Sequence, residues 1–159
     1  MSSRQPTHYA ESLPFLLSQV GARSAQLFAE RLAPLEVSSR AYGVLSNLAG
    51  AASQTQQQLA DALGIHRNNM VGLIDEMEVA GWVRRYRSAQ DRRAFDVRLT
   101  RSGAALVSRV NRLIPALEDE LGQGLTDGER QTMVALLKQL ARTLDLSPGI
   151  HPHLGARSR

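Results

Sequence analysis

The side chains best suited to specific chemistry stand together at positions 66–69, where His, Arg and two Asn residues begin a predicted helix. Arg can bond guanine through two donors, and Asn can bond adenine in a similar two-point way. The N-terminus of a helix also favours phosphate. His66, Arg67, Asn68 and Asn69 are therefore predicted to contact DNA. The simpler interpretations are capping of the first helical turn by Asn68 or Asn69, and capping or phosphate contact by His66.

A cluster of arginines follows. Seven Arg and two Asp lie between Arg84 and Arg101, so this stretch carries a charge of +5, whereas the whole chain carries +4. Arg84, Arg85 and Arg87 are predicted to meet phosphates, which position a protein on DNA without specifying sequence. Arg92 and Arg93 are expected at a hairpin tip, where they can enter the minor groove of an A·T tract. The alternative is a charged hairpin that only faces solvent.

Enzymatic chemistry has little support. We find no nucleophile paired with a base, no phosphate-binding Gly loop and no metal-spaced cluster, and the four His residues are scattered. Glu118, Asp119 and Glu120 are adjacent, and adjacent helical side chains point in different directions. We therefore expect these acids to face solvent rather than to act together in acid catalysis. The absence of Cys excludes disulfides and thiolate metal sites. We expect no enzyme, no cofactor and no metal site.

The positions of apolar and punctuating residues predict the elements that present these side chains. Helices are expected over residues 12–32, from Ser38 or Ser39 to 49, over 55–63 and 66–80, from 103 to 121 with a kink at Pro115, and over 126–144. Two strands are expected over residues 82–88 and 95–100. Thr55 with Gln58, and Thr126 with Glu129, form capping boxes. The predicted order is therefore α-α-α-α-β-β-α-α.

The two short helices in the middle have the pattern of a helix-turn-helix. Such a motif needs a small residue where the helices cross, which is Ala60, and a turn residue that tolerates positive φ, which is Gly64. Apolar residues that clamp the second helix have the required spacing: Leu59, Leu63, Ile65, Met70 and Leu73. An ordinary helical hairpin is the alternative. The hairpin of strands after these helices favours a winged helix-turn-helix.

The predicted fold class is mainly α with a small β-hairpin (α+β). A single domain is expected over residues 10–146, with a winged helix-turn-helix lobe over 38–101 and amphipathic dimerisation helices over 11–33 and 102–146. Residues 1–9 and 147–159 are expected to be flexible tails. The pI of about 10.3 favours an anionic partner, either nucleic acid or an acidic membrane surface. No apolar run is long enough to cross a membrane, and no signal region is seen, so we expect a cytoplasmic protein without a membrane partner.

Several of these segments resemble the MarR family of bacterial regulators, from about Glu11 to Leu146. The strongest match is D-R-R-A-F-D-V-R-L-T-R-S-G, residues 91–103, which is similar to the family's wing signature. Leu63-Gly64-Ile65, followed by Met77-Glu78 and Gly81, also fits the recognition-helix pattern of the family.

The resemblance implies a homodimer whose terminal helices intertwine. It also implies that Asp91 braces the wing by pairing with a nearby Arg, that Arg93 reaches the minor groove, and that a small effector, often phenolic or otherwise anionic, weakens DNA binding. Tyr42, Arg23 and Arg40 are candidates to line its pocket, although a core role for Tyr42 and a surface role for each Arg are the preferred interpretations. His66, Asn68 and Asn69 depart from the usual cap and small hydroxyl residues, so the target sequence should differ.

The sequence therefore predicts a sequence-specific DNA-binding transcriptional regulator, expected to repress, that binds a pseudo-palindromic promoter site on double-stranded DNA as a homodimer. The alternatives are a winged-helix module that binds other proteins, and an architectural protein that binds DNA without sequence preference. Specific, salt-dependent DNA binding separates the first interpretation from the other two.

Overall fold

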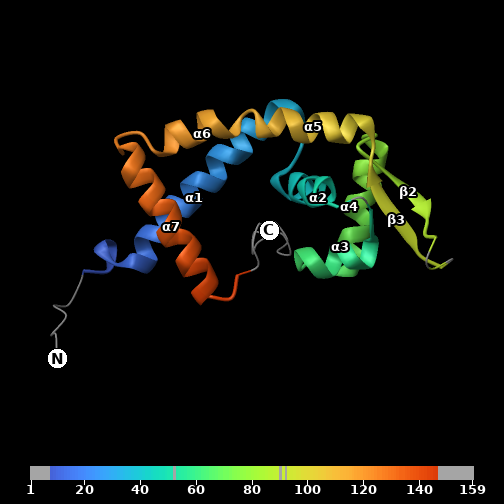
Figure 1. Ribbon diagram of the computed structural model, residues 1–159, viewed down its shortest axis with the longest axis horizontal. Coiled ribbons are helices and arrows are strands. Elements are labelled where there is room, and N and C mark those ends of the chain that lie inside the picture. The colour runs from blue at the N-terminus through green and yellow to red at the C-terminus, as the bar shows by residue number, and fades with distance from the viewer. Residues whose placement is uncertain (1–7, 52, 90, 92, 147–159) are drawn as a thin grey trace.

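The computed structural model describes residues 8–51, 53–89, 91 and 93–146. The expected fold class is confirmed: helices predominate, and a small antiparallel sheet forms the wing (Figure 1). The elements are η1 (Tyr9–Glu11), α1 (Leu13–Leu32), η2 (Ala33–Leu35), α2 (Ser39–Ala49), β1 (Gln54–Thr55), α3 (Gln56–Leu63), α4 (Arg67–Val79), β2 (Val83–Arg87), β3 (Phe95–Leu99), α5 (Arg101–Asn111), α6 (Ile114–Leu121) and α7 (Asp127–Thr143).

Side-chain caps fix where most of the helices begin. Ser12 Oγ accepts the backbone N–H of Phe15 at the start of α1. At the start of α2, the cap is Ser38 rather than Ser39, and its Oγ accepts the N–H of Ala41 at 3.0 Å. Both predicted capping boxes, at the starts of α3 and α7, are confirmed with their two reciprocal hydrogen bonds. These bonds satisfy backbone donors that the first turn of a helix leaves unpaired.

Two details differ from the predicted order. The long helix expected from 103 to 121 is two helices, because α5 ends at Asn111 and α6 begins at Ile114. Pro115 lies in the first turn of α6, where its missing N–H is not needed, whereas in a continuous helix its ring would clash with the carbonyl of Asn111. The two-residue strand β1 was not predicted. It pairs with β3, so the sheet has the order β1-β3-β2.

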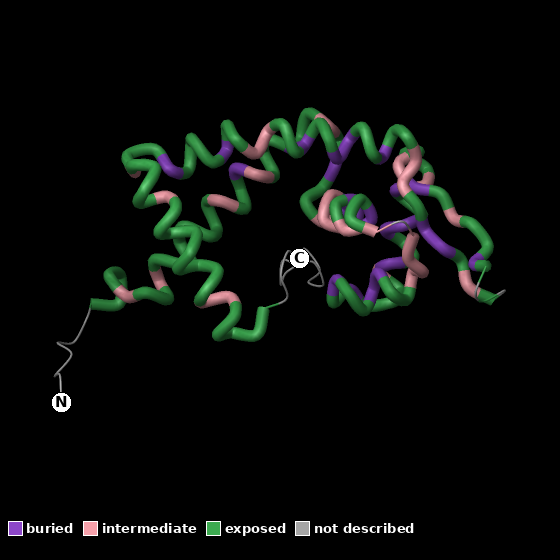
Figure 2. The backbone as a smooth tube through the Cα atoms, in the orientation of Figure 1, coloured by how far each residue is buried: buried purple, intermediate pink, exposed green. Residues whose placement is uncertain are grey.

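The buried core lies almost entirely in the lobe that carries the wing. In Figure 2, buried residues are concentrated around α2, α3, α4 and the sheet, and the α1 and α7 end of the molecule is mostly exposed. The largest fully buried side chains are Leu32, Leu45, Leu59, Met70, Ile74, Met77, Val44, Val83, Val97 and Val110. This core supports α4 and the sheet as one unit, which positions the predicted DNA-binding residues.

Within the described residues, no helix is both long enough and apolar enough to cross a membrane. In the same part of the chain, no group of three or more His, Asp or Glu side chains is placed to hold a metal ion.

Candidate nucleic-acid interface

The turn between α3 and α4 has the geometry that a helix-turn-helix requires. Gly64 adopts a left-handed conformation, with φ of 62°, as predicted from its position. The N–H of Ile65 donates to the carbonyl of Ala60 at 3.0 Å, and Ala60 itself is buried. A non-glycine residue at position 64 would meet the steric penalty of positive φ. The turn therefore directs α4 across α3.

The start of α4 is capped by His66. Its Nδ1 accepts the backbone N–H of Asn68 at 3.3 Å. Arg67 and Asn68 are exposed and Asn69 is partly buried, and within the described residues neither Asn side chain forms a hydrogen bond. His66 therefore caps α4, and the side-chain amides of Asn68 and Asn69 are left available to a ligand. Met70, Leu73, Ile74 and Met77 face the core.

The wing holds its arginines in different ways. Arg84 lies opposite Arg98 in the β2–β3 register, and both are exposed. The guanidinium of Arg98 lies 5.1 Å from the centre of the Tyr86 ring, and that of Arg87 lies 5.9 Å from the centre of the Phe95 ring. Aromatic faces attract cations, so these contacts restrict the two arginines to the surface of the sheet.

The tip of the wing is organised by Asp91. Its Oδ1 accepts the backbone N–H of Arg93 at 2.8 Å, and its carbonyl accepts the N–H of Ala94 at 2.9 Å. Asp91 therefore contacts the main chain of Arg93, whose side chain is exposed, and the pairing of Asp91 with an arginine side chain that the family resemblance implies stays a prediction. Arg92 lies outside the described residues.

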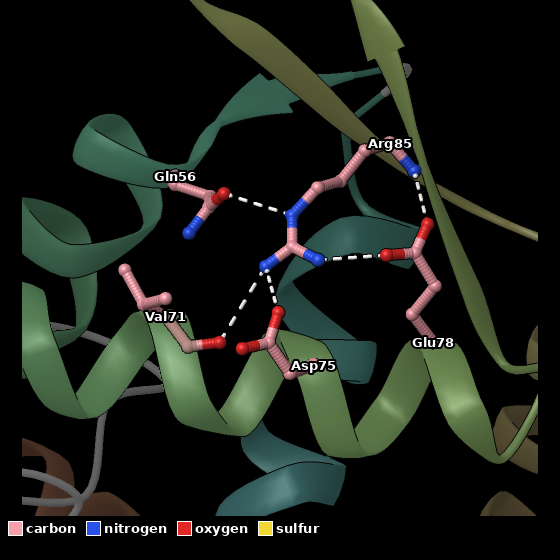
Figure 3. A network of polar contacts seen from close by, with 5 residues as sticks. All are labelled: Gln56, Val71, Asp75, Glu78 and Arg85. Carbon is pink, nitrogen blue, oxygen red and sulfur yellow. Dashed lines mark hydrogen bonds and ion pairs between the residues drawn. The ribbon is translucent and has the colours of Figure 1, made fainter.

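Arg85 departs from its expected role as a phosphate contact, because its guanidinium is already occupied (Figure 3). Nε donates to Gln56 Oε1 at 2.9 Å, Nη1 pairs with Glu78 Oε2 at 2.7 Å, and Nη2 pairs with Asp75 Oδ1 at 2.6 Å. Only 19% of the side chain is exposed. Arg85 therefore ties the first strand of the wing to α3 and α4 and fixes the angle between the wing and α4.

Glu78 receives a second bond from the same residue. The backbone N–H of Arg85 donates to Glu78 Oε1 at 3.0 Å. This bond, helped by the guanidinium, holds the pKa of Glu78 below its ordinary value of 4.5. Asp75 and Glu78 were not singled out from the sequence. Two acids three residues apart on one helix face were the available signal, but the pattern does not identify their partner.

The contacts of Glu78 predict a defined acid sensitivity. Because its pKa is lower in the folded state, Glu78 contributes stability above its ordinary pKa of 4.5 and loses it as the pH falls towards the folded value. We expect Glu78→Gln to show a smaller drop in Tm between about pH 7 and about pH 3.5 than the wild type, by a few degrees. Thermal melts by circular dichroism measure this. Glu118→Gln, at an exposed position on α6, is the control and should behave as the wild type, and equal drops for all three proteins would contradict the assignment.

Two of the residues considered for an effector pocket have structural partners. The hydroxyl of Tyr42 donates to Asn111 Oδ1 at 2.7 Å, and its ring packs edge-on against Phe28. Arg23 pairs with Glu30 at 3.5 Å on the surface of α1. These contacts agree with the preferred interpretations, a core role for Tyr42 and a surface role for Arg23. Arg40 instead lines a cavity beside α4.

Comparison with known proteins agrees with this geometry. A family model described as "MarR family" matches residues 35–94, which run from η2 through the wing tip. The multiple antibiotic resistance protein MarR of Escherichia coli is 30% identical over 126 residues, which cover 79% of this chain and 88% of that protein. A putative transcriptional regulatory protein for the hcr operon of Thauera aromatica is 28% identical over 134 residues, 84% of this chain and 81% of that protein.

The same relationship is seen in solved structures. The reduced form of E. coli MarR superimposes with a TM-score of 0.75 at 30% identity, covering 86% of this chain and 98% of that one. A mutant of E. coli MarR complexed with operator DNA matches with a TM-score of 0.71 at 29% identity, over 85% of this chain and 99% of the other. With its helix-turn-helix, its arginine-bearing wing and these relatives, the chain belongs to the MarR family of DNA-binding transcriptional regulators, which are not enzymes.

Proposed function

We propose that this regulator represses transcription by binding a pseudo-palindromic promoter site as a homodimer, with α4 of each subunit in the major groove. The observation that carries the proposal is the exposed start of α4, which presents Arg67 and Asn68 on the same helix that Arg85 ties to the arginine-bearing wing. The start of a recognition helix is the part that usually contacts base edges. A solved complex of the E. coli relative with operator DNA supports DNA binding by this fold.

Separate tasks are proposed for the two basic elements. Arg67, Asn68 and Asn69 would contact bases or the adjoining phosphates, with His66 holding the first turn of α4. Arg84 and Arg87 would follow the backbone, while Arg93, at the wing tip, would enter the flanking minor groove, and the same role is proposed for Arg92. Asp91 acts through the main chain of Arg93. Arg85 is left out of the DNA contacts because its donors are used within the protein.

The proposed dimer is supported by apolar surface that the single chain leaves uncovered. None of the residues of α7 is buried, although the helix carries six large apolar side chains on its surface or just beyond its end: Met133, Val134, Leu136, Leu137, Leu144 and Leu146. The first half of α1 exposes four more: Leu13, Leu16, Leu17 and Val20. Large apolar side chains left exposed in such numbers are typical of protein interfaces. For a dimer formed here to bind successive major grooves, the two α4 helices must lie about 34 Å apart, one turn of DNA.

An effector site is proposed where α1 meets α6. A cavity of about 470 Å³ is lined by Leu27, Glu30, Arg31, Pro34, Leu35, Leu113 and Glu120. Its apolar walls suit an aromatic ring, and an anionic ligand would compete with Glu120 for the guanidinium of Arg31, its partner in the free protein. Binding would act by favouring one spacing of the two α4 helices over another. As a regulator of transcription, the protein is proposed to act in the cytoplasm.

The experiment that tests the function is fluorescence anisotropy on a duplex taken from beside the protein's own gene, with a shuffled duplex as control, over a salt series. A preference of about a thousandfold for the natural sequence, with affinity that falls steeply with salt, is expected of a specific regulator. Equal binding to both duplexes would point to an architectural role, and no binding at low salt would point to a protein-interaction module.

The wing assignment gives a separate prediction. Arg93→Ala should weaken binding to the natural duplex by about tenfold, because it removes a cation from a groove of concentrated negative potential, and should leave the dimer intact. Anisotropy and light scattering measure the two effects. Arg142→Ala removes an exposed arginine from α7 and is the matched control. Normal DNA binding by the Arg93 variant would show that the wing tip does not reach the DNA.

A further inference from the structure

A second cavity, of about 330 Å³, lies between the first turn of α2 and the exposed face of α4. Its lining comes from both helices: Ser38, Arg40, Asn68, Asn69, Gly72, Leu73 and Glu76. Two of these, Asn68 and Asn69, belong to the predicted interface. Ser38, Arg40, Gly72 and Glu76 do not. The cavity therefore extends the polar surface of α4 towards α2.

Arg40 is the distinctive group in this cavity. Its Nε and Nη2 are shielded from solvent, and neither has a hydrogen-bond partner among the residues that the structure describes. Glu76 lines the same cavity but lies beyond ion-pair distance, and no other acid in the described part of the chain pairs with Arg40. A charged donor held away from water without a partner is destabilising. The free protein therefore keeps two guanidinium nitrogens, Nε and Nη2, whose donors are not used by the described part of the chain.

An anion is the chemical class that would satisfy this group. The planar guanidinium offers paired donors that match two oxygens of a phosphate. Asn68 and Asn69, on the opposite wall, add amide donors that make no bond within the described chain. Glu76 opposes an anion, so it limits how tightly the cavity holds one. A phosphodiester with a single charge, held by several other contacts along its strand, fits these conditions better than a free dianion.

We propose that Arg40 binds a backbone phosphate of the DNA strand that borders the major groove occupied by α4. The inference rests on the proposed function, which places the start of α4 in that groove and so brings a phosphate to the mouth of the cavity. To reach it, the side chain turns outward, and its two buried donors gain acceptors. Arg40 thereby stabilises the DNA-bound state relative to the free one. It raises the affinity equally for every DNA sequence, because phosphates carry no base identity.

The test compares Arg40→Gln with the wild type on the natural and the shuffled duplex over a salt series. The variant should lose about tenfold in affinity for both duplexes, with its preference between them unchanged. The slope of log affinity against log salt should become shallower by about two, one phosphate for each subunit of the dimer. Arg142→Gln, which removes an equal charge from the exposed face of α7, should leave the affinity and slope as in the wild type.

Stability of the free protein provides a second readout. Because Arg40 has two buried donors without partners, Arg40→Gln should keep or raise the Tm in the absence of DNA. Glu76→Gln should tighten DNA binding without lowering the Tm. A lower Tm for both variants would mean that Arg40 and Glu76 pair in solution and would overturn the proposal.

Two further outcomes separate this inference from its premises. If the wild type binds no DNA, the proposed function itself is wrong. If the wild type binds DNA and Arg40→Gln binds equally well with the same salt slope, only the inference is wrong. A free anion is distinguished by adding inorganic phosphate at matched ionic strength: a rise in the Tm of the wild type but not of Arg40→Gln, with equal DNA affinity for both, would assign the cavity to a small anion instead.

Discussion

Replacing Gly103 with alanine is expected to lower the free energy of unfolding by about 3 kcal/mol or more, which is at the upper end for an overpacked site. A Cβ at this position would lie 2.0 Å from the carbonyl oxygen of Trp82 and 2.9 Å from its carbonyl carbon. No side-chain rotation relieves a clash with backbone. Gly103, in the first turn of α5, is therefore the point where this helix meets the chain entering the wing.

The obstructing carbonyl cannot easily retreat. It accepts the N–H of Thr100 at 3.0 Å, and the hydroxyl of the same residue donates to the preceding carbonyl, that of Gly81, at 2.6 Å. Thr100 is also the cap of α5, since its Oγ1 accepts the N–H of Gly103. Moving Trp82 would therefore break the start of α5 and the exit of the wing together. This contact explains why a glycine is needed at this place in the residue pattern 91–103.

Urea unfolding followed by circular dichroism measures the effect, with Gly72→Ala as the matched control. Gly72 is also helical, in the middle of α4, but a Cβ there meets nothing within 4 Å. Alanine in that position should stabilise the protein by about 0.5–1 kcal/mol, because it has the better helix propensity. If the two variants shift the unfolding midpoint by similar amounts, the packing of α5 against Trp82 is not as described.

The other large effect is expected from Leu136→Glu on α7. In a single chain, 55% of this side chain is exposed, so a carboxylate there should be harmless to an isolated subunit. In a dimer that forms through α1 and α7, the same substitution places an unpaired charge in each half of the apolar interface. An unpaired buried charge destabilises an interface by several kcal/mol. We expect the dissociation constant of the dimer to rise by about a thousandfold or more, and specific DNA binding to fall with it.

Light scattering at micromolar concentration separates the two states, because one chain has a mass of 17.4 kDa and a dimer has twice that. Gln131→Glu adds the same charge to the same helix on the side away from the leucines, so it should remain dimeric. A dimeric Leu136→Glu protein with normal DNA affinity would show that the subunits associate through another surface. A variant that loses its helical circular dichroism would instead show that α7 supports the single chain.

Features that depend on residues close together in the sequence could be predicted from the sequence. The two capping boxes and the positive φ at Gly64 were predicted, because each is decided within about one helical turn. The helix-turn-helix spacing was predicted because its residues all lie in one short continuous stretch, from Leu59 to Leu73. The wing followed from β-favouring residues on both sides of a charged connector. Its strands proved shorter than expected at their ends, Val83–Arg87 and Phe95–Leu99.

Features that depend on distant residues meeting in space were decided by the tertiary structure. Arg85 was predicted to contact phosphate because its sequence neighbours are basic, yet folding brings it to Gln56, Asp75 and Glu78. The strand β1 exists only because β3 lies beside it. The sequence shows only that a helix cannot continue unchanged through Pro115, so it predicts a kink. The direction that α6 takes after α5 decides that the helix is broken instead.

The amino-acid sequence by itself determined the type of protein, since local patterns of residue type specify a helix-turn-helix, a basic wing and amphipathic terminal helices. Tertiary structure decided which arginines remain available for DNA. Every guanidinium in the sequence has the same charge, but its availability depends on whether a carboxylate lies within reach after folding. Arg85 has two such carboxylates, and Arg40, with two nitrogens shielded from water, has none within ion-pair distance in the part of the chain that the structure describes.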